Sequence, residues 1–142
     1  MIKKLKKLKK KSLSLLKRKA WKEFSLWIRL KDSDPDGFNV CVTCGVRRYY
    51  TELQAGHFLA GRTNGILFDE RGVYPQCVRC NIFLRGNVEE YYPFMLEKHG
   101  QEVIDELKRK KKQLLKYSRE DYEDMIKKFS DLSLRRKSEL RI

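Results

Sequence analysis

The chain has 142 residues and a formal net charge of +14, a size that fits one small domain with appended elements. No apolar run approaches the length of a membrane span, and lysines interrupt the basic start of the chain too often for a secretory signal. We therefore expect no membrane partner and a reducing cytoplasm, where cysteines bind metal rather than form disulfides.

The charge is unevenly distributed along the chain. Residues 1–31 hold 13 Lys and Arg against one Glu, residues 32–107 hold 7 basic against 12 acidic residues, and residues 108–142 hold 13 against 6. This division predicts a basic amphipathic helical arm, a mildly acidic central core and a basic helical C-terminal extension. DNA is the expected partner of the basic parts, because each phosphate neutralised by Lys or Arg releases counterions. Solvated faces that only keep the chain in solution are the alternative.

Apolar residues recur at helical spacing through the first arm. They are Ile2, Leu5, Leu8, Leu13, Leu16, Ala20, Phe24 and Trp27 or Ile28. This pattern predicts one basic helix, or two helices that break near Ser12 and Ser14. Because aromatic residues crowd its second half, we expect that half to dock on the core and the first half to stay free. The turn-rich stretch 32–37 ends the helix.

Short extended segments follow the arm. Residues 38–42 alternate like a strand, and residues 49–58 form a second extended candidate. A loop is predicted over 59–64. Residues 66–68 and 73–74 are then expected to pair as two strands of a β-hairpin around residues 69–72.

All four cysteines lie in two Cys-x-x-Cys pairs, Cys41–Cys44 and Cys77–Cys80, with 32 residues between them. A two-residue spacer lets both sulfurs of a pair reach one tetrahedral ion, so the pairs predict a four-thiolate zinc site. Such a site leaves no open position for substrate, and the zinc is therefore structural. Strands before the site and a helix at its second pair predict a small zinc-stapled α+β core of treble-clef, or ββα-metal, type.

Two polar residues near the cysteines suit phosphodiester hydrolysis. His57 is the only histidine between the pairs, and Asn81 directly follows Cys80. A neutral imidazole can take a proton from an attacking water, and an amide oxygen is a hard ligand for Mg²⁺ or Mn²⁺. The alternatives are an ordinary hydrogen-bonded histidine or spare ligand at 57, and a helix N-cap at 81.

Several basic residues lie near this site in the sequence or on the helix beyond it. The candidates for phosphate contact are Arg62, Arg79, Arg85, Lys108, Arg109 and Lys110. Solvated surface positions are the alternative for each of them.

Helices are predicted for the rest of the chain. One runs from Asn87 to His99, where Gly100 ends it and His99 serves as a cap residue. A second runs from residue 101 to about residue 115, and a capping box of Ser118 and Asp121 begins the last. A homodimer interface is a further possible role for these helices.

The chain resembles the NinG/Rap family of lambdoid phage recombination proteins over roughly residues 17–107. The resemblance rests on KRKAWKEFSLWIRLKDSDPDGFNVCVTCG at 17–45, QAGHF at 54–58, FDE at 68–70, PQCVRCN at 75–81 and GNVEEYY at 86–92. Members are described as structure-selective DNA endonucleases and resemble the wider HNH, or His-Me finger, nucleases. The resemblance implies a metal-dependent endonuclease that cuts branched intermediates such as Holliday junctions or D-loops in the host cytoplasm.

The chain departs from the HNH pattern at three positions: Gly56, the region of Gly72, where the middle Asn of the pattern is missing, and Asn81, which replaces the last His. Many HNH nucleases have an Asp or His metal ligand directly before the catalytic histidine, and this chain has Gly56 there. Asp69 is the first candidate for the missing ligand, with Glu70 and Glu90 behind it, and a turn residue is the alternative at 69.

Two other functions remain open at this stage. The core is either a non-catalytic treble-clef module that binds DNA or RNA, or an adaptor in a phage recombination complex whose arms contact proteins.

Overall fold

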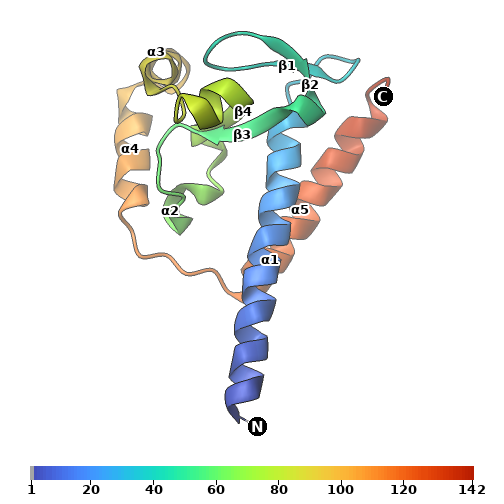
Figure 1. Ribbon diagram of the computed structural model, residues 1–142, viewed down its shortest axis with the longest axis vertical. Helices are drawn as coiled ribbons and strands as arrows, with labels where there is room; N and C mark the ends of the chain where they lie inside the picture. Colours follow the sequence, from blue (N-terminus) through green and yellow to red (C-terminus); the bar gives the residue numbers. More distant parts are fainter. Residues whose placement is uncertain (1) are drawn as a thin grey trace.

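The computed structural model describes the backbone of residues 2–142, with all side chains in that range except those of residue 2 and residues 4–11. Helix α1 (Ile2–Leu30) is continuous through both serines at which a break was considered. Its second half packs on the core, where Ala20, Phe24 and Ile28 are fully buried. The side chains of Ile2, Leu5 and Leu8, which begin the predicted stripe, lie outside the description. In Figure 1 the first turns of α1 extend past the rest of the chain.

Two small antiparallel sheets form the β part of the molecule. Their strands are β1 (Phe38–Val40), β2 (Arg47–Tyr49), β3 (Leu53–His57) and β4 (Val73–Cys77). β1 pairs with β2, and β3 pairs with β4 in a register that places Leu53 opposite Cys77 and His57 opposite Val73. A 3₁₀ turn, η1 (Tyr50–Glu52), separates β2 from β3 and divides the extended stretch predicted over 49–58.

The predicted hairpin of residues 66–68 with 73–74 is wrong. Helix α2 (Asn64–Leu67) occupies the first segment, and the amides of Ile66 and Leu67 donate to the carbonyl oxygen of Thr63 at 3.0 and 2.9 Å. A Cβ at Gly65 would lie 1.8 Å from the carbonyl oxygen of Lys110, so α2 lies directly against a later helix. The apolar run at 66–68 therefore reflects burial in a helix, and β4 takes β3 as its partner.

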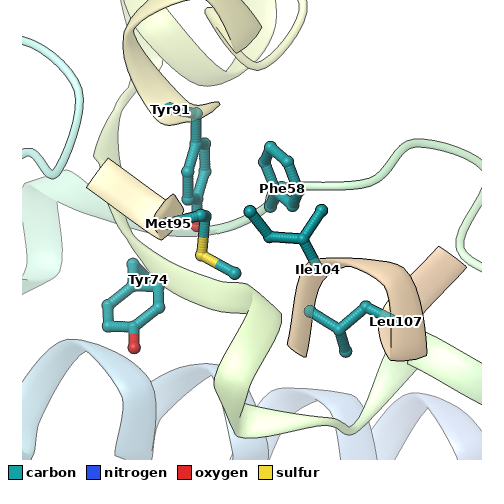
Figure 2. Close-up of a cluster of buried hydrophobic side chains, with 6 residues drawn as sticks. All are labelled: Phe58, Tyr74, Tyr91, Met95, Ile104 and Leu107. Atoms are coloured by element: carbon teal, nitrogen blue, oxygen red, sulfur yellow. The ribbon is translucent and has the colours of Figure 1, made fainter. Parts of the chain in front are cut away.

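Helices cover both faces of the β3–β4 sheet (Figure 1). The later helices are α3 (Val88–His99), α4 (Gln101–Lys111) and α5 (Arg119–Ser138). On one face lies the α1–α5 cluster, which comprises Phe24, Ile28, Ala55, Val73 and Phe129. On the other face lies the α3–α4 cluster, which comprises Phe58, Tyr74, Tyr91, Met95, Ile104 and Leu107 (Figure 2). Because Ala55 and Phe58 belong to opposite clusters, the end of β3 is fixed from both sides.

The predicted C-terminal helices are present. α3 ends at His99 as predicted, whereas α4 ends at Lys111 and is shorter than expected. The capping box is confirmed, because the Ser118 hydroxyl accepts from the Asp121 amide at 3.1 Å and the Asp121 carboxylate accepts from the Ser118 amide at 2.7 Å. α5 packs along α1 of the same chain (Figure 1), so part of the apolar surface that suggested a dimer is already covered. The homodimer stays a prediction.

The α+β class, with helices before and after two small sheets, agrees with the expectation from the sequence. Within residues 2–142, no helix is both long enough and apolar enough to cross a membrane. The division of the chain at residues 31 and 107 stays a prediction.

Candidate functional site

The four cysteine sulfurs meet at the end of β4. Cys41 and Cys44 lie in the turn between β1 and β2, Cys77 ends β4, and Cys80 lies in the short helical segment η3 (Arg79–Phe83). All four Sγ atoms lie within 4.8 Å of one another, and those of Cys44 and Cys77 are 3.7 Å apart. An ion with four Zn–S bonds of about 2.3 Å places its sulfurs about 3.8 Å apart. The cluster can therefore hold a metal ion such as zinc.

Hydrogen-bond donors surround the sulfurs. Asn87 Nδ2 donates to Cys80 Sγ at 3.5 Å, and Thr43 Oγ1 lies 3.3 Å from Cys41 Sγ. Burial opposes ionisation of Cys41, but hydrogen bonds from Thr43 and the backbone lower its pKa to about 6. Burial and the neighbouring sulfurs instead raise the pKa of Cys44 to about 12. A bound cation would stabilise the thiolate form of all four cysteines, including Cys44, because thiolate is the form that binds metal.

His57 is the last residue of β3 and is half-buried. Its Nε2 lies 3.1 Å from the carbonyl oxygen of Leu67, and its ring stacks on Trp21 of α1 at 5.2 Å with 17° between the planes. Since a carbonyl oxygen only accepts, Nε2 carries the proton and Nδ1 is the basic nitrogen. Burial lowers the pKa of His57 below its usual range; the bond to Leu67 opposes this shift and the charge of Arg62 adds to it. The ring is therefore neutral at neutral pH.

Asn81 is held by β3. Its Nδ2 donates to Gln54 Oε1 at 2.8 Å, which fixes the plane of the amide. Its Oδ1 accepts no hydrogen bond from any described side chain or backbone amide. Asn81 lies inside η3 and not at its N-cap, which is Val78, so capping does not explain it.

A groove passes over these two residues. It consists of two adjoining cavities of about 410 and 420 Å³. The residues that line both are Ala55, Arg62, Asn81 and Ile82; the first also includes His57, Arg85 and Val88, and the second Trp21, Ser25, Arg29 and Gln54. Three arginines thus line the groove, while its lining contains no carboxylate among the described residues.

The position before His57 has no room for a side chain. A Cβ at Gly56 would lie 1.9 Å from Oε1 of Gln76, which is fully buried. Gln76 cannot move aside freely, because its Nε2 donates to Thr43 Oγ1 at 3.0 Å and to the carbonyl oxygen of Gly86 at 2.9 Å. This packing is the physical reason why a metal ligand is missing from position 56.

Asp69 is occupied elsewhere. Its Oδ2 lies 2.8 Å from both Arg71 Nη2 and Lys110 Nζ, and its Oδ1 accepts from the amide and Nε of Arg71. Burial opposes ionisation, but these bonds outweigh it and lower the pKa of Asp69 to about 2. The carboxylate joins the segment before β4 to α4 and does not line the groove. The structure thus gives no support to its role as a metal ligand.

Glu70 and Glu90, the other candidates for the missing metal ligand, are also absent from the groove lining. Glu70 Oε1 accepts from Trp27 Nε1 at 2.6 Å, and Glu90 is exposed on α3. The structure therefore brings no carboxylate to His57 and Asn81.

Only some of the predicted basic residues reach the groove. Arg62 lies over the Trp21 ring at 4.4 Å, and Arg85 is exposed and lines the same cavity. Arg79 is exposed beside Cys44 and Cys77, outside the groove lining.

The basic run on α4 does not line the groove. Lys108 and Arg109 are exposed, and Lys110 pairs with Asp69. Phosphate contact by this run stays a prediction.

Three groove residues were not identified from the sequence. Trp21 and Arg29 lie on α1, where the aromatic content predicted only docking, and Gln54 lies on the strand of His57. The available signal for Gln54 was the QAGHF segment itself, in which an amide side chain lies three residues before the histidine on the same strand.

Comparison with known proteins identifies the family of the chain. The NinG family, described as "Bacteriophage Lambda NinG protein", matches residues 1–138. Protein ninG of Escherichia phage 933W is 32% identical over 107 residues, which cover 71% of this chain and 51% of that protein. Protein ninG of Escherichia phage lambda and that of Salmonella phage P22 are each 31% identical over 107 residues, covering 71% of this chain and 50% of theirs.

The chain spans about half the length of the curated relatives it matches. No solved structure matches it. The family match includes both cysteine pairs, the groove and all of α5. The chain therefore belongs to the NinG family of lambdoid phage proteins.

Proposed function

We propose that the chain is a metal-dependent DNA endonuclease of the His-Me finger type, built on a zinc-stapled treble clef. The observation that carries the proposal is the groove, in which a neutral histidine and an oriented asparagine lie among arginines. Two antiparallel strands and a helical segment, β3, β4 and η3, supply them, and this is the element order of a ββα-metal site. The cysteine cluster holds the end of β4 against η3.

His57 acts as the general base in this proposal. Its Nε2–H is bound to the Leu67 carbonyl, so Nδ1 is the atom that accepts a proton from water. The resulting hydroxide attacks phosphorus, and the bond from phosphorus to the leaving sugar oxygen breaks. Because burial lowers the pKa of His57, the ring is ready to accept a proton at neutral pH.

Asn81 Oδ1 is the protein ligand for the catalytic cation. Mg²⁺ or Mn²⁺ in such sites binds through few protein oxygens, substrate phosphates and water. The groove fits this pattern, because Asn81 Oδ1 is an amide oxygen that accepts no hydrogen bond from described residues and the described lining has no carboxylate, so DNA phosphate must complete the site. When bound, the ion stabilises negative charge on the phosphate and the leaving oxygen.

The arginines position the DNA backbone. Arg62 is held on the Trp21 ring, and the exposed Arg85 lines the cavity that contains His57, so DNA phosphates near His57 have two cationic partners. α1 contributes Trp21 and Arg29 to the groove, which makes the basic arm part of the site rather than a separate handle.

The test is a cleavage assay with Mg²⁺ on linear duplex, single-stranded and four-way-junction DNA. We expect His57→Ala to lose about 10²- to 10⁴-fold in rate, the usual contribution of a general base. The control is His99→Ala: His99 ends α3, its Nε2 lies 2.6 Å from the Tyr74 hydroxyl, and it does not line the groove. This control should cut like the wild type.

The assay also separates the alternatives. Wild-type protein that binds DNA without cutting any of the three substrates would point to the non-catalytic zinc module. Protein that does not bind DNA would favour an adaptor in a phage recombination complex. Cutting that is unchanged in His57→Ala would remove His57 from the mechanism while leaving the nuclease.

Branched recombination intermediates in the host cytoplasm are the proposed substrate and place of action. The proposal for Holliday junctions or D-loops follows from the family resemblance and from the strong positive charge of the chain. Faster cutting of the junction than of linear duplex is the expected result in the same assay.

A further inference from the structure

An exposed apolar tip lies directly after Asn81. Four of its side chains are large, apolar and open to solvent: Ile82 at 55%, Phe83 at 77%, Leu84 at 42% and Val88 at 51% exposure. We call these four residues the Phe83 tip. An isolated exposed apolar side chain needs no explanation, but a contiguous group of them marks a site of interaction.

The tip is held rigidly by the cysteine cluster. The amide of Gly86 donates to the carbonyl oxygen of Cys80 at 2.9 Å, and that of Leu84 donates to the carbonyl oxygen of Arg79 at 2.8 Å. The turn that follows takes positive φ at Arg85, Gly86 and Asn87, with values of 51°, 93° and 48°. Two of these φ values belong to non-glycine residues, so the turn tolerates strain to keep its shape.

The half-buried Asn87 and the buried Gln76 fix the far end of this turn. Asn87 Nδ2 donates to Cys80 Sγ, and Gln76 Nε2 donates to the carbonyl oxygen of Gly86. Phe83 is therefore presented to solvent from a preorganised segment, and little entropy is lost when it binds.

The tip borders the proposed catalytic groove. Ile82 lines both of its cavities, and Val88 and Arg85 line the one that contains His57. Arg85, two residues after Phe83, is also exposed. An exposed aromatic ring followed by an exposed arginine that lines the cavity suits a nucleotide, whose base stacks and whose phosphate pairs with arginine.

The charges argue against the other occupants. A second copy of this chain would bring further arginines to the same surface of a molecule with a net charge of +14. An apolar protein partner at the Phe83 tip would gain nothing from the exposed charge of Arg85, two residues away in the chain. A nucleic acid can use both the aromatic ring and the arginine.

We propose that the Phe83 tip inserts into DNA beside the cleavage groove and stacks Phe83 on an unstacked nucleobase. Opening a continuous duplex costs stacking energy, and this cost is smallest where a base is already unpaired or at a branch. The tip thus selects DNA with a disrupted stack and places the adjacent phosphate over His57 and Asn81. This inference rests on the proposed function, because it assumes that DNA lies in the groove.

The test measures binding without added Mg²⁺, so cutting does not enter. The probes are a duplex with one unpaired 2-aminopurine and a continuous duplex of the same length, compared by fluorescence anisotropy and 2-aminopurine emission. Phe83→Ala should lose roughly 5- to 150-fold in affinity for the bulged probe, the range for one base–aromatic stack. Its affinity for the continuous duplex should stay unchanged.

Three control variants show whether the aromatic ring causes the preference for the bulged probe. Phe83→Trp should keep the preference because it keeps the ring, while Phe83→Leu should lose it although the side chain stays apolar. Leu114→Ala removes a fully exposed apolar residue in the segment between α4 and α5 and should change nothing. Zinc content and thermal unfolding should be the same in all variants, since none of these side chains is buried.

The outcomes distinguish this inference from the endonuclease. An equal loss on both probes, no loss in Phe83→Ala, or full function in Phe83→Leu would overturn base stacking, whatever the cutting assay shows. A Phe83-dependent preference for the bulged probe in a protein that never cuts would support the tip and remove the catalytic proposal. Absence of DNA binding would overturn both.

Discussion

The cysteine cluster and the groove are neighbours in the chain, since Cys80 precedes Asn81, but they are built on different principles. The cluster has all four of its ligands, at a spacing that suits a tetrahedral ion, and donors that stabilise the sulfurs. The groove has one basic nitrogen, the Asn81 amide oxygen, which accepts no hydrogen bond from described residues, and arginines, with no carboxylate in its described lining. The first site has four protein ligands, whereas the second, under the proposed function, needs its substrate.

Under the proposed function, one site contributes to stability and the other to reactivity. The cluster joins β4, η3 and the β1–β2 turn, so a metal ion bound there contributes to folding. In the proposed endonuclease, DNA phosphate neutralises the arginines of the groove and completes the site of the catalytic cation. Three variants test this difference between the two sites.

Removing a cysteine ligand should have the largest effect. Cys80→Ser is expected to lose zinc and the cooperative unfolding transition of the core, because structural zinc contributes about 10–16 kcal/mol in small zinc peptides and whole domains are stable by only about 5–15 kcal/mol. The measurements are zinc per chain by atomic emission and thermal unfolding by circular dichroism.

Metal exchange is the control for this experiment. Chelator-treated wild type should lose the same transition, Zn²⁺ should restore it and Mg²⁺ should not. A chelated protein that melts like the untreated one would show that the cluster has no structural metal, and the contrast between the two sites would disappear.

The features that were predicted correctly from the sequence are local. The cysteine pairs, the capping box of Ser118 and Asp121 and the end of α3 at His99 each depend on residues a few positions apart. Local spacing fixes which side chains can meet at a turn or a helix end. These elements follow from the sequence because little else in the fold can change them.

The features that were missed depend on contacts between distant segments. Gly65 meets Lys110 across α2 and α4, which decides that 64–67 is a helix. Asp69 meets the same lysine, 41 residues away, which removes it from the proposed site. No periodicity in the sequence reports such pairs.

The groove was predicted in part. His57 and Asn81 were identified because each has a diagnostic neighbour, and the structure places both in one groove. Trp21 was not identified as a groove residue, because an aromatic residue on an amphipathic helix indicates only packing. Its stacking on His57 is visible only once α1 is placed against β3.

Filling the space before His57 should have an intermediate effect. Gly56→Ala puts a Cβ 1.9 Å from Gln76 Oε1, and overpacking of this kind typically costs about 1–3 kcal/mol in the free energy of unfolding. Urea denaturation measures the change. The groove, which depends on β3, should lose cutting activity in the same variant.

The double variant Gly56→Ala, Gln76→Ala tests the cause. Gln76→Ala alone should destabilise the protein, since it removes donors to Thr43 and Gly86, but the two changes together should cost less than their sum because the collision is gone. Additive costs would mean that Gln76 does not determine what fits at position 56.

Removing the ring under His57 should have the smallest effect and is the most specific to the groove. Trp21→Ala should lower kcat/KM for cutting by about tenfold, since the imidazole loses the stack that orients it and Arg62 loses its platform. Trp21→Phe should retain most of the activity. The other tryptophan, Trp27, bonds to Glu70 outside the groove, so Trp27→Phe is the matched control.

The pH profile identifies what Trp21 does. Burial lowers the pKa of His57, so kcat/KM of the wild type should rise with pH below the usual histidine range and level off by neutral pH, as the base loses its proton. Trp21→Ala admits water to the ring, and its inflection should move up towards about 6.5, the value of an unperturbed histidine. A lower rate with an unmoved inflection would mean that Trp21 affects DNA binding and not the base. In that case the proposed base on β3 and the proposed metal ligand on η3 would act without help from α1.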